Sequence, residues 1–210
     1  LGDFTPVAPV LRAPFAVLVA NTPAAPKTLG ELLTSLRVKP QSYASAGVGT
    51  MTHLGSELVL RKAGVQATHV PYKGSGAALT DLMGGQVLFA TDSLTAAMTH
   101  IKSGKLRALG VTSEGREPSL PGVPAVGETV PGYEATAWFG IGMPRGTPRE
   151  IINKVNAEVN RALADPKMRE RLAELGGKPI AGSPEDFGRI IAAETAKWEK
   201  VVNSSGAKAE

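Results

Sequence analysis

The sequence contains no cysteine, and this absence excludes several kinds of chemistry. Without thiols the chain forms no disulfide, no thiolate nucleophile and no cysteine-ligated zinc site. Histidine is scarce as well, at three residues, and neither His-x-x-x-His nor His-x-His spacing occurs. We therefore expect no metal site, and no motif requires a cofactor.

Long apolar runs and strong charge are also missing. No stretch of about 18 apolar residues is present, so we expect no transmembrane helix, and no signal peptide is visible. The chain begins at Leu1 rather than Met, which predicts a processed or truncated product. The formal net charge is +4, which weakly favours anionic ligands. Basic residues are not interleaved with aromatics, so no nucleic-acid partner is expected.

What the sequence does contain is a glycine-rich turn between a strand and a helix, in SYASAGVGTMTHL. The pattern predicts a strand at Ser42–Ser45, a turn at Ala46–Gly49 and a helix that opens near Thr50. The first turn of a helix has unpaired backbone N–H groups and partial positive charge, which suit a small anion such as a carboxylate. The alternative, that the glycines serve only the tight turn, stays open.

The turn does not match the nucleotide-binding or hydrolase motifs. The third glycine of Gly-x-Gly-x-x-Gly would fall at Thr52, and no Gly-Lys-Ser/Thr follows. Ser45 and His53 are disfavoured as nucleophile and base, because the Gly-x-Ser-x-Gly elbow is absent and no acid is placed to orient His53. His53 either reaches a ligand or supports the loop through a hydrogen bond, and we favour support. His69 and His100 are expected to be structural.

Strands and helices alternate through the first two thirds of the chain, which predicts a parallel sheet with helices on both faces. Ligands bind such sheets outside the carboxyl ends of the strands. Three strand-to-helix turns are expected at that edge, at Ala46–Gly49, Lys73–Gly76 and Asp92–Ser93. The strands are expected at residues 15–20, 42–45, 69–72, 86–91 and 106–112.

The second and third turns carry charged residues with two possible roles each. Asp92 follows an apolar strand, so its carboxylate can receive a ligand amine or orient a water; alternatively it is a plain helix N-cap with Ser93. Lys73, beside Gly74, can meet an anionic ligand or remain solvated. Farther along, Thr147-Pro148-Arg149-Glu150 predicts a capping box at the start of a helix.

These segments, in this order, closely resemble one family, the extracytoplasmic substrate-binding proteins of tripartite tricarboxylate transporters, often called the Bug family. The resemblance covers essentially the whole chain. The matching stretches are DFTPVAPV, YASAGVGTMTHLGSELV, VPYKGSGAALTDLMGGQVLFATDS, HIKSGKLRALGVTS, PGYEATAWFGIGMPRGTP and the C-terminal helices.

The resemblance implies an α/β fold of the periplasmic-binding-protein type, with two lobes that each contain a mainly parallel sheet flanked by helices. Residues 16–133 would form the complete second lobe, and residues 1–15 and 134–210 the remaining part of the first lobe. Phe15–Ala20 and Ala135–Gly142 would cross between the lobes. Family members begin with a loop resembling Pro-Phe-x-x-Gly-Gly that has no match here, so the N-terminal part of the first lobe would be missing.

The implied function is a periplasmic receptor, not an enzyme. It would capture a small carboxylate, such as a di- or tricarboxylate, an acidic amino acid or an aromatic acid, and deliver it to the membrane permease subunits of the transporter. Backbone N–H groups of the glycine turn and nearby hydroxyls would meet the carboxylate. The residues implied are Ser45, Ala46, Gly47, Gly49, Thr50, His53, Lys73, Gly74, Asp92 and Ser93.

Two other functions stay open. One is an enzyme of small acids that uses the glycine turn as an oxyanion site. The other is a truncated receptor that binds nothing alone or presents a bound acid to a sensor partner. The residues alone do not name the ligand.

Overall fold

The computed structural model describes residues 2–174 and 176–205. The chain divides into two compact units. The first, here called the sheet unit, comprises Pro14–Thr136 and the described residues from Lys200 onward. The second, the helical unit, comprises the described residues up to Ala13 and Ala137–Glu199. Each unit is described by itself below.

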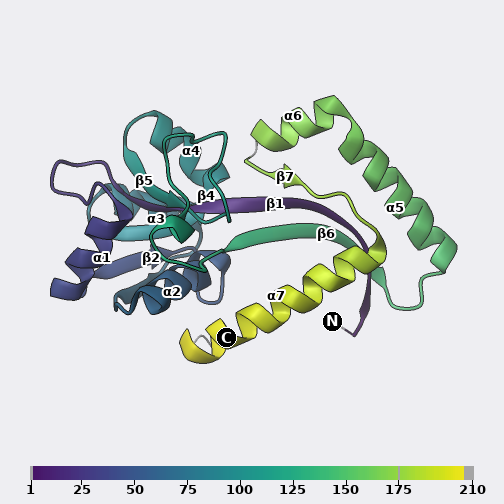
Figure 1. Ribbon diagram of the computed structural model, residues 1–210, viewed down its shortest axis with the longest axis horizontal. Coiled ribbons are helices and arrows are strands. Elements are labelled where there is room, and N and C mark those ends of the chain that lie inside the picture. Colours follow the sequence, from purple (N-terminus) through teal and green to yellow (C-terminus); the bar gives the residue numbers. More distant parts are fainter. Residues whose placement is uncertain (1, 175, 206–210) are drawn as a thin grey trace. The chain divides into compact units, whose positions relative to one another are not determined.

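The sheet unit is built on five strands in the order β3-β2-β4-β1-β5 (Figure 1). β2 runs parallel to β3 and β4, whereas β1 runs antiparallel to β4 and β5. The prediction that segment 15–20 is part of a parallel sheet is therefore wrong. This segment lies in β1, which pairs with β4 and β5, and no crossover helix fixes its direction relative to them. The strands are β1 (Phe4–Ala20), β2 (Ser42–Ser45), β3 (Thr68–Pro71), β4 (Phe89–Ser93) and β5 (Leu106–Val111).

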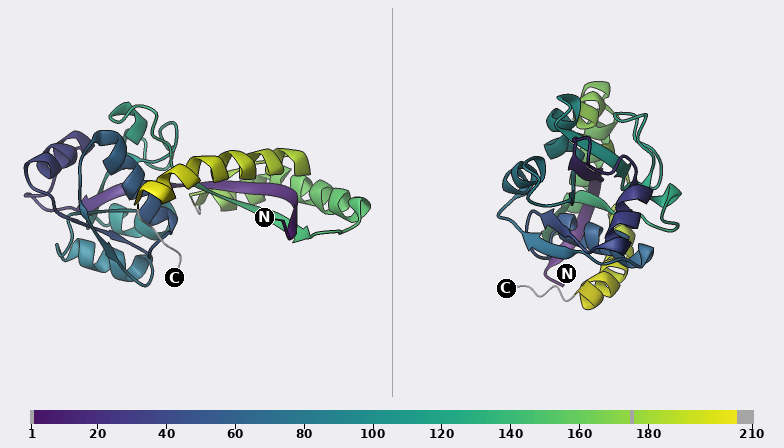
Figure 2. Two further views of the ribbon diagram at one scale, coloured as in Figure 1. Left: turned by 90° about the horizontal axis from the view of Figure 1, so that it is seen from below. Right: turned by 90° about the vertical axis from the view of Figure 1, so that its left-hand side faces the viewer.

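Helices cover both faces of this sheet (Figure 2). Because successive side chains of a strand point to opposite faces, Ala44 and Ala90 lie in the cluster that contains α3 and α4. Their neighbours Tyr43 and Thr91 contact α2 through Glu57 and Ser56 on the other face. The helices are α1 (Leu29–Val38), α2 (Met51–Ala63), α3 (Ser75–Met83), α4 (Leu94–Lys102) and the short η1 (Val126–Glu128).

Local signals account for the ends of the first two helices. The Thr28 hydroxyl accepts a hydrogen bond from the backbone N–H of Glu31 at 3.1 Å and so caps the start of α1. The helix predicted to open near Thr50 is α2, with Thr50 as its N-cap, and Gly64 ends it in the left-handed conformation at φ 65°. That conformation favours glycine because it brings no Cβ into the backbone.

The helical unit joins β6 (Thr136–Pro144), β7 (Lys178–Pro179), α5 (Arg149–Ala164), α6 (Pro166–Glu174) and α7 (Pro184–Ser205) to the first part of β1. Its core contains Val7, Ala8 and Ile152. The predicted cap at Thr147 is wrong: Pro148 occupies the N-cap position, and the Thr147 hydroxyl instead donates to the Pro144 carbonyl at 2.8 Å. The N-cap of α5 therefore lies at Pro148, one residue later than the sequence pattern predicts.

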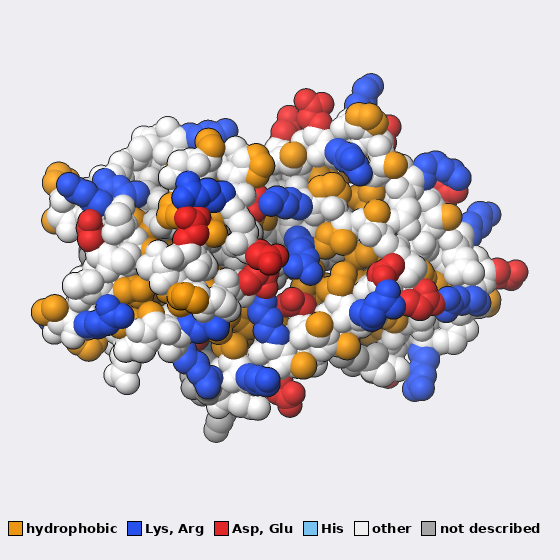
Figure 3. Space-filling view, in the orientation of Figure 1, with side chains coloured by type: hydrophobic (Ala, Val, Ile, Leu, Met, Phe, Trp, Pro, Cys, Tyr) orange, Lys and Arg blue, Asp and Glu red, His pale blue; other side chains and the backbone are white. Residues whose placement is uncertain are grey.

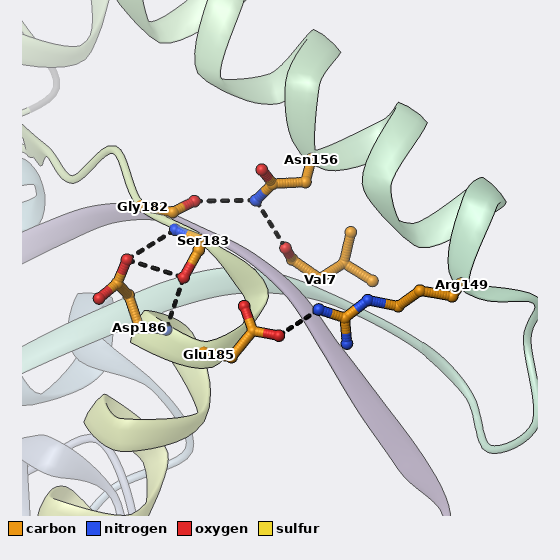
Figure 4. A network of polar contacts seen from close by, with 7 residues as sticks. All are labelled: Val7, Arg149, Asn156, Gly182, Ser183, Glu185 and Asp186. Atoms are coloured by element: carbon orange, nitrogen blue, oxygen red, sulfur yellow. Dashed lines mark hydrogen bonds and ion pairs between the residues drawn. The ribbon is translucent and has the colours of Figure 1, made fainter.

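Polar contacts connect α5, α7 and β1 inside the helical unit (Figure 4). The Asn156 side-chain amide donates to the carbonyls of Val7, at 2.9 Å, and Gly182, at 2.8 Å. Ser183 and Asp186 cap α7 reciprocally, since each side chain accepts from the other residue's backbone N–H. Charges of both signs are interspersed over α5, α6 and α7 (Figure 3). No described helix is long and apolar enough to cross a membrane.

Candidate functional site

The three strand-to-helix turns of the sheet unit meet at the carboxyl ends of β2, β3 and β4. The backbone N–H of Tyr72 donates to the Ser45 carbonyl at 2.9 Å, and that of Gly74 donates to the Ala46 carbonyl at 3.1 Å. The Ser75 hydroxyl donates to Asp92 Oδ1 at 2.8 Å. The turns that the sequence placed at one edge are therefore joined to one another by hydrogen bonds.

The glycine loop between β2 and α2 satisfies its own backbone. Each N–H group that the sequence assigned to a ligand already has an acceptor within the loop or the first turn of α2. The sequence pattern predicts unpaired donors at the start of a helix, but it does not predict which side chains accept hydrogen bonds from them. The bonds run from Ala46 N to Thr52 Oγ1 (2.8 Å), Gly47 N to Ser45 Oγ (3.1 Å), Gly49 N to His53 Nδ1 (3.1 Å) and Thr50 N to the Gly47 carbonyl (3.4 Å).

Other backbone donors remain open at the same edge. Within the described residues, the N–H groups of Met51 and Thr52 at the start of α2, and of Ser75 and Gly76 at the start of α3, donate to no acceptor. Open donors and the positive ends of the helix dipoles attract anions. The anion-binding potential therefore lies at the first helical residues rather than within the loop.

Asp92 is buried at this edge, with 1% of its surface exposed. Its Oδ1 accepts from Ser75 Oγ and, at 2.7 Å, from the backbone N–H of Ser93. Its Oδ2 is buried with no partner among the described residues. Burial raises the pKa of Asp92, although the bonds from Ser75 and Ser93 oppose the shift. Ser93 is the true N-cap of α4, since its hydroxyl accepts from the Ala96 N–H at 3.2 Å.

Two histidines stack beneath the glycine loop. The rings of His53 and His69 lie 3.9 Å apart between centroids and 7° from parallel. His53 Nδ1 accepts the Gly49 N–H, as the predicted loop support requires. His69 was expected to be only structural, yet its Nε2 lies 2.6 Å from Ser45 Oγ. The signal that could have located it is the parallel register, which sets His69 opposite Tyr43 on β2.

The Lys73 side chain, unlike the other charged predicted site residue, Asp92, is exposed to solvent. It makes no ion pair or hydrogen bond within the described residues. Gly74, beside it, has a φ of 110°, which a residue with a Cβ rarely adopts. The glycine therefore allows the turn that brings Ser75 to Asp92, and Lys73 can reorient freely.

Comparison with known proteins identifies the chain's family. Residues 1–207 match the family described as the tripartite tricarboxylate transporter family receptor. The chain belongs to this family. A protein encoded in the tcbD–tcbE intergenic region of Pseudomonas sp. strain P51 is 41% identical over 204 residues, which are 95% of this chain and 60% of that protein. The chain therefore spans about three fifths of that relative's length.

Solved structures of family members share the fold. R. palustris Rpa4515 with adipate has 38% identity and a TM-score of 0.88, over 97% of this chain and 69% of that one. MatC from Rhodopseudomonas palustris with bound malate has 34% identity and a TM-score of 0.82, over 95% and 69% of the two chains. The α/β fold of the periplasmic-binding-protein type is thereby confirmed. The matching family is described as one of transporter receptors.

For this family member, the geometry gives little support to a hydrolase. Ser45 pairs with His69 rather than with His53, and its side chain is buried, with 1% exposed. Among the described residues, no carboxylate forms a hydrogen bond with either imidazole ring. A nucleophilic serine needs access to substrate and a base oriented by a third group. Ser45 instead accepts the Gly47 N–H and shapes the loop.

Proposed function

We propose that this chain is a periplasmic solute receptor that holds the carboxylate of a small organic acid at the edge where β2, β3 and β4 end. The observation that carries the proposal is the convergence of the α2 and α3 N-termini, with open N–H groups at Met51, Thr52, Ser75 and Gly76. The partial positive charges at the starts of α2 and α3, whose preceding turns are joined by a hydrogen bond, favour a carboxylate over a neutral group.

The predicted site residues divide into three roles under this proposal. Ser45, Ala46, Gly47, Gly49 and Thr50 form the loop that positions the open donors, and ordered waters extend their reach to the ligand. His53 supports the loop from below. Lys73, Gly74, Asp92 and Ser93 set selectivity from the neighbouring turns, with Lys73 available to a second acidic group.

Family membership supports the class of ligand and the destination. Rpa4515 and MatC are described with adipate and malate, both small dicarboxylates. We infer that this chain takes a ligand of that class and passes it, unchanged, to the membrane permease of a tripartite tricarboxylate transporter. We assign residues 16–133 to the second lobe of the receptor, and residues 1–15 and 134–210 to the part of the first lobe that this chain contains.

Isothermal titration with malate and with adipate tests the proposal. Gly47 adopts a φ of 144°, so a valine there strains the loop, and its Cβ would lie 3.6 Å from Thr50 Cγ2 and from the Tyr72 carbonyl. We expect Gly47→Val to weaken binding at least roughly tenfold, about 1.4 kcal/mol. Gly85→Val is the matched control, because Gly85 also has a positive φ, 72°, and open space but follows the other end of α3.

Each result has a clear meaning. Loss of binding in Gly47→Val with retention in Gly85→Val supports the loop as the element that positions the open donors. Equal affinity in a folded Gly47→Val protein contradicts the assignment. Conversion of either acid to another compound during the titration would favour the enzyme alternative, in which the same donors stabilise an oxyanion.

A further inference from the structure

The stacked histidines sit where they can control the glycine loop. His53 Nδ1 accepts the Gly49 N–H at 3.1 Å, so that nitrogen carries no proton. The Gly47 N–H reaches His69 indirectly, because it donates to Ser45 Oγ, which lies 2.6 Å from His69 Nε2. The Gly49 N–H is therefore held by an imidazole directly, and the Gly47 N–H is linked to one through Ser45 Oγ, which also donates to the Gly47 carbonyl at 3.1 Å.

The surroundings of the pair favour the neutral imidazoles. Tyr43 of β2 stacks on His69 at 5.0 Å and lies 6.4 Å from His53, and its hydroxyl donates to Glu57 of α2. Among the described residues, Tyr43 and Glu57 are the titratable groups beside the two rings. Burial lowers the pKa of His53, against the opposing charge of Glu57. Burial, with a contribution from His53, lowers the pKa of His69 to about 4.

We propose that His53 and His69 are positioning residues that hold the glycine loop in its ligand-ready form only while both imidazoles are neutral, so that acidification releases the loop. A proton on His53 Nδ1 would replace an acceptor by a donor and leave the Gly49 N–H without a partner. A charge on one ring would also disfavour a charge on the other, 3.9 Å away. The part of this inference that concerns ligand affinity rests on the proposed function, whereas the part that concerns the loop does not.

The first test follows the protein by NMR without ligand, from pH 7.5 to 3.5, a range that extends below the His69 pKa of about 4. We expect the Gly47 and Gly49 amide signals to shift with the same midpoint as the ring signals of His53 or His69, and not with that of His100. His53→Asn is the informative variant, because its side-chain oxygen can accept the Gly49 N–H but does not titrate. His69→Gln similarly retains an acceptor near the position of Nε2.

In either variant we expect the glycine signals to keep their neutral-pH positions and to lose most of their pH dependence. Glycine signals that titrate unchanged in both variants would overturn the proposal. The same holds if they stay constant in the wild-type protein while the histidine rings titrate. The amide spectrum at pH 7.5 shows whether each variant is folded, and either one suffices for the comparison.

The second test measures malate and adipate affinity against pH in the wild type and in the His53→Asn/His69→Gln double variant. Taking the ratio of the two dissociation constants removes the titration of the ligand itself and of Asp92. We expect the ratio to rise toward acid pH, approaching about tenfold per pH unit below the first pKa of the pair. A ratio that stays constant would mean a merely structural role. If neither acid binds at pH 7.5, the proposed function fails, and the loop proposal still stands or falls by the NMR result.

Discussion

The two units of the chain differ in where they place polar groups. Among the described residues, buried polar side chains lie in the sheet unit with the exception of Glu194. Many of them gather at the carboxyl edge of the sheet. The helical unit instead keeps its charges at the surface, in exposed pairs such as Arg161–Glu158 and Arg171–Glu174. The buried set near the edge comprises Ser45, Thr52, His53, Ser56, Thr91 and Asp92.

This difference separates the functional part of the chain from the supporting part. A buried polar group costs free energy unless it is fully hydrogen-bonded, and Asp92 Oδ2 is not. Exposed ion pairs contribute little to stability in either direction. The sheet unit thus carries an unfavourable group at the proposed site, whereas the helical unit depends on packing around β1 and β6.

The largest expected effect breaks the packing of the helical unit. A Cβ on Gly140 would lie 2.2 Å from the Phe187 ring and 2.7 Å from the Ala8 carbonyl, so Gly140→Ala must displace backbone or ring. We expect a loss on the order of 3 kcal/mol in that unit. Hydrogen exchange by mass spectrometry should show faster exchange in α5 and α7, with α2 and α3 unchanged.

Gly142→Ala is the control for this prediction. A Cβ there has its nearest neighbour, the Thr5 carbonyl, at 3.6 Å, an ordinary contact. Its exchange profile should match the wild type. Equal profiles for Gly140→Ala and the wild type would show that β6 does not pack against Phe187 as described.

A smaller effect should appear when the buried charge of the sheet unit is removed. Because the pKa of Asp92 is raised in the folded state, the protein loses stability as the pH rises from about 4 through that pKa. Asp92→Asn does not ionise, so we expect it to be more stable than the wild type at pH 7, by on the order of 1 kcal/mol. The difference should shrink toward pH 4.

Urea unfolding at pH 4, 5.5 and 7 measures this difference, and Ser93→Ala separates it from loss of the α4 cap. A variant that is less stable than the wild type at pH 7, and equally so at pH 4, would mean that Asp92 is a satisfied structural group. In that case only the position of Asp92 at the proposed site would support a role for it in ligand binding.

The smallest expected effect compares two threonines that look alike in sequence. Thr28→Ala removes the cap of α1 in the sheet unit and should cost about 1 kcal/mol. Thr147→Ala removes only an exposed hydrogen bond to the Pro144 carbonyl and should cost less than about half as much. Thermal unfolding of the two variants checks the order. A larger loss for Thr147→Ala would restore the capping box that the pattern predicted.

Much of the sheet unit could be predicted because its signals are local. Gly64 ends α2 through its own backbone conformation, and Thr28 caps α1 through a residue three positions away. The contact among the three turns follows from alternation, since parallel strands joined by helices end at one edge. The direction of β1 has no such local cause, because it depends on strands β4 and β5 far along the chain.

The details of the site were less accessible from sequence. Which N–H groups remain open depends on Thr52 and His53 folding back onto the loop, and rotamers of that kind have no signature in the residue pattern. His69 reaches Ser45 only through the pairing of β2 with β3. Ser45 lies two residues beyond Tyr43, the position opposite His69, and so on the same face of the sheet. A search for polar residues at such diagonal positions would have found the pair, whereas motif spacing could not.

The most direct test of the carboxylate site is a map of amide NMR shifts during titration with malate and with adipate at pH 7.5. We expect at least one acid to shift the amides of Met51, Thr52, Ser75 and Gly76, the open donors at the start of α2 and α3. The Gly85 amide, beyond the other end of α3, should stay in place. Saturable shifts confined to other parts of the chain, or no shifts with either acid, would contradict it.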